Sequence, residues 1–228
     1  MVSLTSQPPA QGNDAALHSG RMSTLDLIAA ERRTIADELE GLTAEQLATQ
    51  SLCNAWTVHD VAAHLLMPLT LGMGTVLAAM AAALGRFDRA NIKLTAKVAE
   101  RPIAEIAAEL RAQAQNTFTP PGMGFEAPLT DALVHGEDFR RPLGLTHQFD
   151  PAAMRTSLDF VTTNKGQRVF PGKARLAGLR FEAQDIGWCN GDGAPVRGRA
   201  ADVLLAICGR TVALDDLTGE GVSLLRIR

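Results

Sequence analysis

Helical spacing of apolar residues dominates residues 23–163. Ser23 can cap a first helix, which Gly41 ends. The side chains that share one face of this helix are Leu25, Ile28, Ala29, Arg32, Ile35 and Leu39. The same periodicity predicts further helices, which begin at Val58 and Thr130 or span residues 86–98, 103–117 and 151–162. This share of helix predicts a mainly α fold.

The pattern changes after a linker-like stretch at residues 164–172. Leu179, Phe181 and Ala183 alternate with polar residues, and a period of two predicts a strand. A short edge strand, a helix and a last strand are predicted over residues 196–198, 200–208 and 222–227. We therefore expect a small α+β unit at residues 173–228. This unit is too small to be a stable domain by itself, so it should pack on the helical part at residues 23–163.

Two further segments could lie outside a soluble fold, one as a disordered tail and one as a membrane span. Residues 1–22 are rich in Pro, Gly, Ser and Gln and carry no hydrophobic periodicity, which predicts a disordered tail. Residues 65–85 contain no charged residue and must be tested as a membrane span. Pro68, Gly72 and Gly74 interrupt this stretch, so we predict a pair of buried helices with a break, and no membrane partner.

Composition and charge narrow the function classes. The net charge is -3 and the pI is near 6.0, which gives no electrostatic reason to expect binding to nucleic acid or to an anionic membrane. Tyrosine is absent and aromatic residues make up only 4% of the chain. Helix packing, rather than stacking of sheets, should therefore build most of the core.

The cysteines indicate a reducing compartment. Cys53, Cys189 and Cys208 are odd in number and form no C-x-x-C pair, which argues against a disulfide framework. Each is interpreted as a small buried hydrophobic residue. The chain opens without a secretory signal pattern, so we predict a cytoplasmic protein.

One stretch, TDALVHGEDFRRPLG at residues 130–144, points to chemistry. If it forms a helix, Asp131 and His135 stand one turn apart and present a carboxylate and an imidazole side by side, which are common zinc ligands. The same spacing recurs at Asp60 and His64, and two facing helices can build a metal site in a bundle. The pairs can equally be local hydrogen bonds, and Asp60 can be a helix-cap partner or can orient His64.

Three stretches together resemble a known family. SLCNAWTVHDVAAHLL, DALVHGEDFRRPLG and WCNGDGAPVRGRAADVLLAICGRTVALDDLTGEGV look like the mycothiol-dependent maleylpyruvate isomerase family of the DinB-like metalloprotein superfamily. The resemblance implies a DinB-like four-helix bundle followed by a small C-terminal α+β domain. It implies a divalent metal, usually zinc, held by His64, Asp131 and His135. The founding isomerase has a glutamate where this chain has Asp131.

The resemblance also implies a reaction. A thiol coordinated at the open metal position loses its proton and becomes a nucleophile. In the family this thiol is mycothiol, an actinobacterial substitute for glutathione. Its thiolate can add to an electrophilic double bond, which then rotates and re-forms, or it can stay attached. The implied partners are a small electrophile and a low-molecular-weight thiol, and the implied enzyme is an isomerase or an S-transferase, monomeric or dimeric.

Two polar residues are candidates for supporting roles. Arg210 stands where the family sends an arginine from the small domain toward the site, where it would bind a substrate carboxylate or the thiol cofactor; alternatively it satisfies the last carbonyls of a helix. Asp138 can orient His135 or accept a hydrogen bond from thiol or substrate, or it can pair with Arg141. Two other functions stay open: a non-catalytic protein that binds metal or a small molecule, and a metal-dependent hydrolase.

Overall fold

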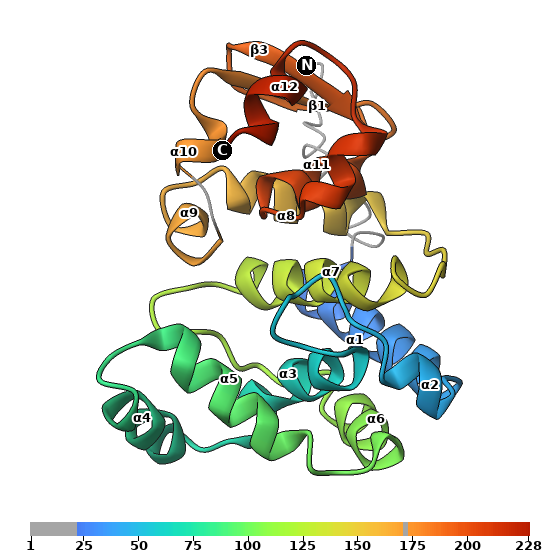
Figure 1. Ribbon diagram of the computed structural model, residues 1–228, viewed down its shortest axis with the longest axis vertical. Helices are drawn as coiled ribbons and strands as arrows, with labels where there is room; N and C mark the ends of the chain where they lie inside the picture. The colour runs from blue at the N-terminus through green and yellow to red at the C-terminus, as the bar shows by residue number, and fades with distance from the viewer. Residues whose placement is uncertain (1–21, 171–172) are drawn as a thin grey trace, which may run out of the picture.

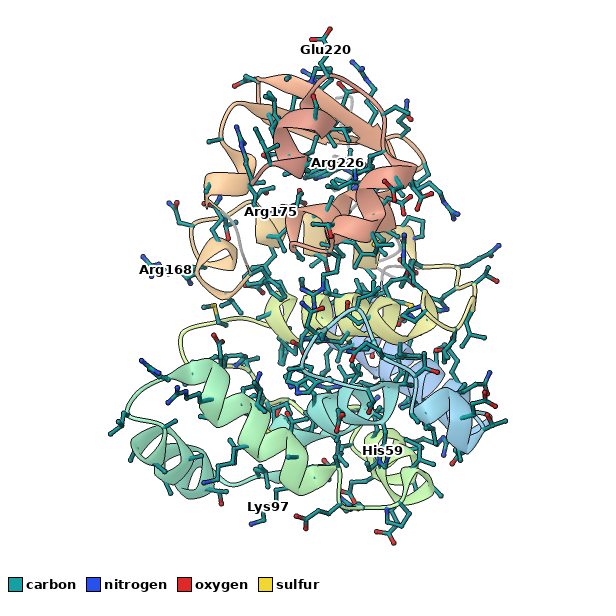
Figure 2. All side chains as sticks on the ribbon, in the orientation of Figure 1. His59, Lys97, Arg168, Arg175, Glu220 and Arg226 are labelled. Atoms are coloured by element: carbon teal, nitrogen blue, oxygen red, sulfur yellow. The ribbon has the colours of Figure 1, made fainter. Side chains whose placement is uncertain are left out.

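The computed structural model describes residues 22–170 and 173–228. Residues 1–21, where most of the predicted tail lies, fall outside the described residues. The chain forms a lower helical part and an upper α+β unit, with α7 lying between them (Figure 1). Charged side chains such as those of Lys97, Arg168 and Glu220 project outward from both parts (Figure 2).

Four helices form the bundle that positions the site. They are α1 (Thr24–Glu40), α3 (Val58–Thr70), α6 (Ile103–Ala112) and α7 (Glu126–Arg140). α1 packs on α6 and α7, and α3 packs on the same two helices, so the four enclose a common core. Ser23 caps α1 as predicted, through a reciprocal capping box with Asp26.

The remaining helical segments surround this bundle or lead away from it. They are α2 (Ala44–Leu47), α4 (Met73–Ala82), α5 (Phe87–Val98), α8 (Pro151–Val161), α9 (Gly166–Val169) and α10 (Lys173–Leu176). The uncharged stretch at residues 65–85 is divided between α3 and α4, with the break at Leu71 and Gly72. Among the described residues, no helix is both long and apolar enough to cross a bilayer.

The α+β unit contains a three-stranded sheet. Its strands are β1 (Leu179–Ala183), β2 (Trp188–Asn190) and β3 (Ala194–Gly198), in the order β2-β1-β3. β1 pairs antiparallel with β2 and parallel with β3, so β3 is the edge strand that the sequence predicts. α11 (Ala200–Ile207), a 3-10 helix (Thr211–Asp216) and α12 (Gly221–Arg226) complete the unit.

The last predicted strand is wrong: residues 222–227 belong to α12 and its end, not to a strand. Gly221 and Leu225, four residues apart, are the buried positions of this segment, which is helical spacing. A Cβ on Gly221 would come within 2.6 Å of the carbonyl oxygen of Ala194, so this end of α12 packs directly against β3. The fold class is confirmed: the protein is mainly α, with a small C-terminal α+β unit.

α7 supplies side chains to both hydrophobic cores. Ala132 and Phe139 lie in the core of the bundle, whereas Leu129 and Leu133 lie in the core that the bundle shares with α8, α11 and the sheet. Every residue of α7 from Ala132 to Arg140 is buried. The helix is therefore fixed from both sides, and it carries three of the candidate site residues.

Candidate metal centre

α7 carries Asp131, His135 and Asp138. The residues are four and three positions apart, which keeps them on one face of the helix. His135 and Asp138 are buried, while the side chain of Asp131 is 34% exposed. The group is therefore open to solvent on the side of Asp131.

α3 supplies His64 and holds it rigidly. The helix starts after Thr57, which shares a reciprocal capping box with Asp60, so Asp60 serves as the cap partner. The ring of Trp56 stacks on the imidazole of His64, with ring centroids 4.4 Å apart. This stacking fixes the plane of a buried histidine.

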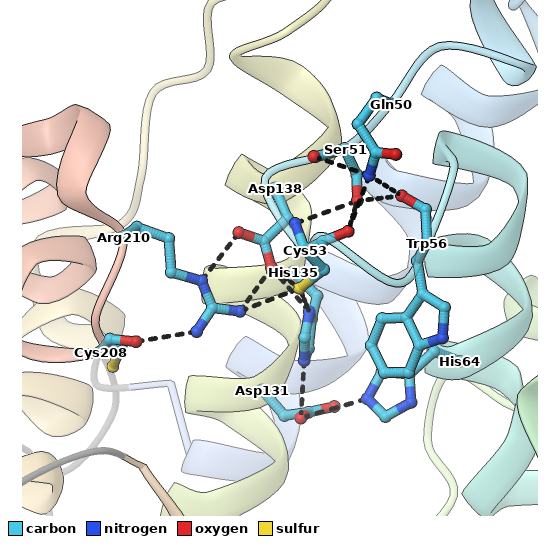
Figure 3. Close-up of polar contacts among 10 residues, drawn as sticks. All are labelled: Gln50, Ser51, Cys53, Trp56, His64, Asp131, His135, Asp138, Cys208 and Arg210. Carbon is cyan, nitrogen blue, oxygen red and sulfur yellow. Dashed lines mark hydrogen bonds and ion pairs between the residues drawn. The ribbon is translucent and has the colours of Figure 1, made fainter. Parts of the chain in front are cut away.

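His64, Asp131 and His135 converge on one point (Figure 3). Oδ1 of Asp131 lies 3.7 Å from Nε2 of His64 and 3.5 Å from Nε2 of His135. Two atoms that each bind zinc at ~2.1 Å in a tetrahedron stand about 3.4 Å apart. The three side chains are thus spaced as the ligands of a small cation would be.

The second nitrogen of His135 is also accounted for. Nδ1 lies 2.8 Å from Oδ2 of Asp138. An ionised carboxylate only accepts hydrogen bonds, so Nδ1 carries the proton and Nε2 is left facing Asp131. Nδ1 of His64 is buried and has no partner among the described residues.

Arg210 reaches this group from the α+β unit. Gly209 has a φ of +87°, a conformation that favours glycine, and this turn after α11 directs Arg210 toward α7. Nε and Nη2 of Arg210 donate to the two oxygens of Asp138, at 2.9 and 2.6 Å, and Nη1 donates to the carbonyl oxygen of Cys208. Arg210 thus contacts the group of site residues and also a carbonyl at the end of α11, the two positions that the sequence analysis considered for it.

Asp138 does not pair with Arg141, the alternative that the sequence left open. Arg141 pairs instead with Glu137, Asp202 and Asp216, on the side of α7 that faces the α+β unit. Asp138 holds His135 and Arg210 together.

Cys53 is a site residue that sequence reasoning missed. It is only partly buried, and its Sγ lies 3.1 Å from Oδ2 of Asp138, 3.3 Å from Nη2 of Arg210 and 3.8 Å from Nδ1 of His135. Its interpretation as a small buried hydrophobic residue is therefore wrong. Cys189 is exposed, so that interpretation also fails there, whereas Cys208 is buried as expected. The signal available for Cys53 is that it lies within SLCNAWTVHDVAAHLL, one of the three stretches that carry the resemblance.

The pKa values of the group show how its charges act on one another. Burial alone would raise the pKa of Asp131, but the charges of His135, His64 and Arg210 outweigh it and hold this pKa at about 2. Burial would lower the pKa of His135, but Asp131 and Asp138 outweigh it and raise this pKa to about 10. Burial and the charge of His135 lower the pKa of His64. Positive charge is thus stabilised between the imidazoles and the acids.

Comparisons with known proteins agree with this architecture. Residues 28–119 match the family model of the mycothiol maleylpyruvate isomerase N-terminal domain. The fold is similar to the crystal structure of the mycothiol-dependent maleylpyruvate isomerase, with a TM-score of 0.52 and 17% identity over 88% of this chain and 96% of that chain. A histidine-to-alanine mutant of that isomerase gives a TM-score of 0.48 and 15% identity over the same shares. Among curated proteins, none matches the chain significantly.

Proposed function

We propose that the protein is a metal-dependent enzyme that uses a low-molecular-weight thiol, because residues 28–119 match the family model of the mycothiol maleylpyruvate isomerase N-terminal domain. The thiol is mycothiol, and the substrate is a small electrophile such as maleylpyruvate. The reaction is cis-trans isomerisation or S-transfer. The proposed ligands of the metal are His64, Asp131 and His135, and the proposed site of action is the cytoplasm.

The observation that carries the proposal is the convergence of these three donors. Two imidazoles and one carboxylate suit zinc, and three protein ligands leave one position free. A divalent metal bound there would hold a coordinated thiol as its thiolate, the nucleophilic form. The partly exposed side chain of Asp131 marks the side from which thiol and substrate would enter.

The chain's own residues keep the site in this state. Asp138 holds the proton of His135 on Nδ1, which orients Nε2 toward the other two donors. Arg210 keeps Asp138 ionised and adds positive charge beside the site. Trp56 covers one face of His64 and excludes water from it.

A thiolate held beside this site would determine the outcome. It would add to one carbon of an electron-poor double bond, with the electron pair of that bond moving onto the neighbouring carbonyl group. Rotation about the new single bond and expulsion of the thiolate would give the trans isomer, whereas protonation of the adduct would give a thioether. The same residues serve both outcomes.

The test is turnover by the zinc-loaded protein. With mycothiol present, we expect isomerisation of maleylpyruvate or conjugation of a small electrophile. We expect His64→Ala to lose both bound zinc and turnover. His59→Ala is the matched control, because His59 lies on the same helix but its Nε2 contacts the carbonyl oxygen of Arg101, 3.1 Å away.

Two outcomes would contradict the proposal. Stoichiometric zinc without turnover of any electrophile would indicate a non-catalytic binding protein. Zinc-dependent cleavage of an ester or amide without added thiol would indicate a hydrolase.

A further inference from the structure

The α4–α5 pair, residues 72–99, exposes apolar side chains where the two helices meet. Leu84 is 88% exposed and Phe87 is 66% exposed, and both follow α4, which contains no charged residue. Ile92 of α5 is 44% exposed. These three are among the eight large apolar side chains that are exposed in the described part of the chain. A single exposed apolar residue is ordinary, but several in one short segment indicate an interaction surface.

The backbone of Leu84 is strained. Its φ is +53°, and among the described residues it is the one non-glycine residue with a positive φ. This left-handed conformation is unfavourable for leucine, because its Cβ approaches the following carbonyl oxygen. The next residue, Gly85, adopts a φ of +75° without such a cost. The chain thus keeps a leucine in a position that suits glycine, although the folded protein does not bury its side chain.

Basic residues accompany this apolar surface. Arg86 precedes α5, and Arg89, Lys93 and Lys97 follow at intervals of four, so the last three share one side of the helix. All four are exposed, and none forms an ion pair with a described residue. Lys97 projects outward from α5 (Figure 2). Residues 72–99 contain these four basic residues and one acid, a net charge of +3, although the whole chain carries -3.

An anionic lipid surface matches both features. Basic side chains are attracted to negatively charged headgroups, and exposed apolar side chains enter the interface beside them. The local charge decides this attraction, because charges separated by more than ~10 Å of water are largely screened at physiological salt. The sequence analysis argued against anionic membranes from the charge of the whole chain, which averages over this local excess.

We propose that the α4–α5 pair docks on an anionic lipid membrane. Leu84 and Phe87 enter the interface, while Arg89, Lys93 and Lys97 contact the headgroups. α4 and α5 lie at the end of the molecule opposite the α+β unit, so a bilayer can approach them without contacting that unit (Figure 1). The proposal goes beyond the reaction proposed above and does not depend on it, because the proposed metal ligands belong to α3 and α7.

The test is flotation of the full-length protein with lipid vesicles. We expect binding to vesicles of phosphatidylcholine mixed with phosphatidylglycerol, no binding to phosphatidylcholine alone, and weaker binding when salt is added. Arg89→Gln/Lys93→Gln should weaken binding ~30-fold, since each basic residue beside an anionic surface contributes a factor of about five. Lys165→Gln/Arg168→Gln is the matched control, because it removes the same charge from two exposed residues at α9.

Leu84→Gly tests the apolar contribution without a cost in folding. Glycine adopts the φ of this position freely, so the melting temperature should not fall. Loss of the leucine side chain should nevertheless weaken binding to the anionic vesicles ~10-fold. Ile227→Gly is its control, because Ile227 is 83% exposed but lies near the C-terminus, in the α+β unit. A purely structural role of Leu84 would change the melting temperature and leave binding unaltered.

Several results would overturn the proposal. The wild type could bind neither kind of vesicle, or both equally, or the Leu84 and Arg89/Lys93 variants could bind as tightly as their controls. A dimer that Leu84→Gly disperses in sedimentation, without vesicle binding, would assign the surface to a second copy of this chain. Binding to nucleic acid but not to vesicles would assign it to that polymer. No measurement uses metal, thiol or turnover, so failure here leaves the proposed reaction untouched.

Discussion

A single carboxylate, that of Asp138, accepts hydrogen bonds from side chains of three separate segments. His135 lies on the same helix, Cys53 on the loop before α3, and Arg210 in the α+β unit. Burial would raise the pKa of Asp138, but the hydrogen bonds from His135 and Arg210 outweigh it and hold this pKa well below its usual range. The carboxylate is therefore ionised at neutral pH.

Asp138→Asn should weaken zinc binding ~10- to 100-fold, because the amide can no longer fix the proton of His135 on Nδ1 and Arg210 loses its counter-ion. The measurement is competition for zinc with a chromophoric chelator. Asp202→Asn is the matched control, since Asp202 is also a buried acid paired with an arginine, Arg141, but away from the donors. Equal zinc affinity in both variants would show that Asp138 does not orient His135.

At the scale of single residues, the sequence predicts the proposed metal ligands better than it predicts the residues around them. Asp131 and His135 could be paired because helical spacing places them on a shared face. His64 joined them through the repeated spacing at Asp60 and His64 and through the family resemblance. The sequence places Arg32 on the apolar face of its helix, between Ile28 and Ile35. The helical spacing does not show which groups this buried guanidinium contacts. The contacts of Cys53 depend on how a loop folds over α7, where the backbone N–H of Leu52 donates to the carbonyl oxygen of Asp138. No local pattern encodes that contact.

The junction of α1 and α7 contains a buried ionic cluster. The guanidinium of Arg140 is fully buried and pairs with Glu31 at 2.9 Å and with Glu38 at 2.8 Å. His147, from the segment after α7, lies 3.2 Å from Glu31. Burial would raise the pKa of Glu31, but the hydrogen bond with His147 and the charge of Arg140 outweigh it and lower this pKa below 4.5.

Glu31 should therefore stabilise the fold in a pH-dependent way. A carboxyl whose pKa is lower in the folded state contributes stability above its unfolded pKa, and this contribution is lost as the pH falls through the folded pKa. Glu31→Gln should lower the free energy of unfolding by about 2 kcal/mol at pH 7. The difference from wild type should shrink below pH 4.5. Urea unfolding of both proteins from pH 3 to pH 7 measures it, and a difference independent of pH would refute the assignment to charge.

The sequence predicts a helix well where apolar spacing continues over several turns and a capping residue marks its start, as in α1. Two ends were not. The predicted helix at residues 103–117 stops at Ala112, where Arg32 binds the carbonyls beyond it. The predicted strand at residues 222–227 is α12, because a six-residue segment takes its conformation from the packing of Gly221 on β3 rather than from its own pattern.

The whole molecule is held by cores that meet at α7. The core of the α+β unit continues into α1, α7 and α8, and Trp188 of β2 donates a hydrogen bond to Asp159 of α8 at 2.7 Å. A unit that completes its core with the bundle should not unfold separately from it.

The two tryptophans report on the two parts, and they test this expectation. Trp56→Phe leaves Trp188 in the α+β unit, and Trp188→Phe leaves Trp56 beside His64. In each variant, the urea curve from tryptophan fluorescence should coincide with the curve from far-ultraviolet circular dichroism. A Trp188 curve that precedes the dichroism curve would show that the α+β unit opens first.

All three proposed donors belong to the bundle, whereas Arg210 alone arrives from the other side of α7. A substitution that loosened the α+β unit from the bundle would therefore displace the guanidinium and leave the three donors in place. Affinity for a metal would then be set by the bundle alone, whereas charge beside the metal would depend on how the two parts dock.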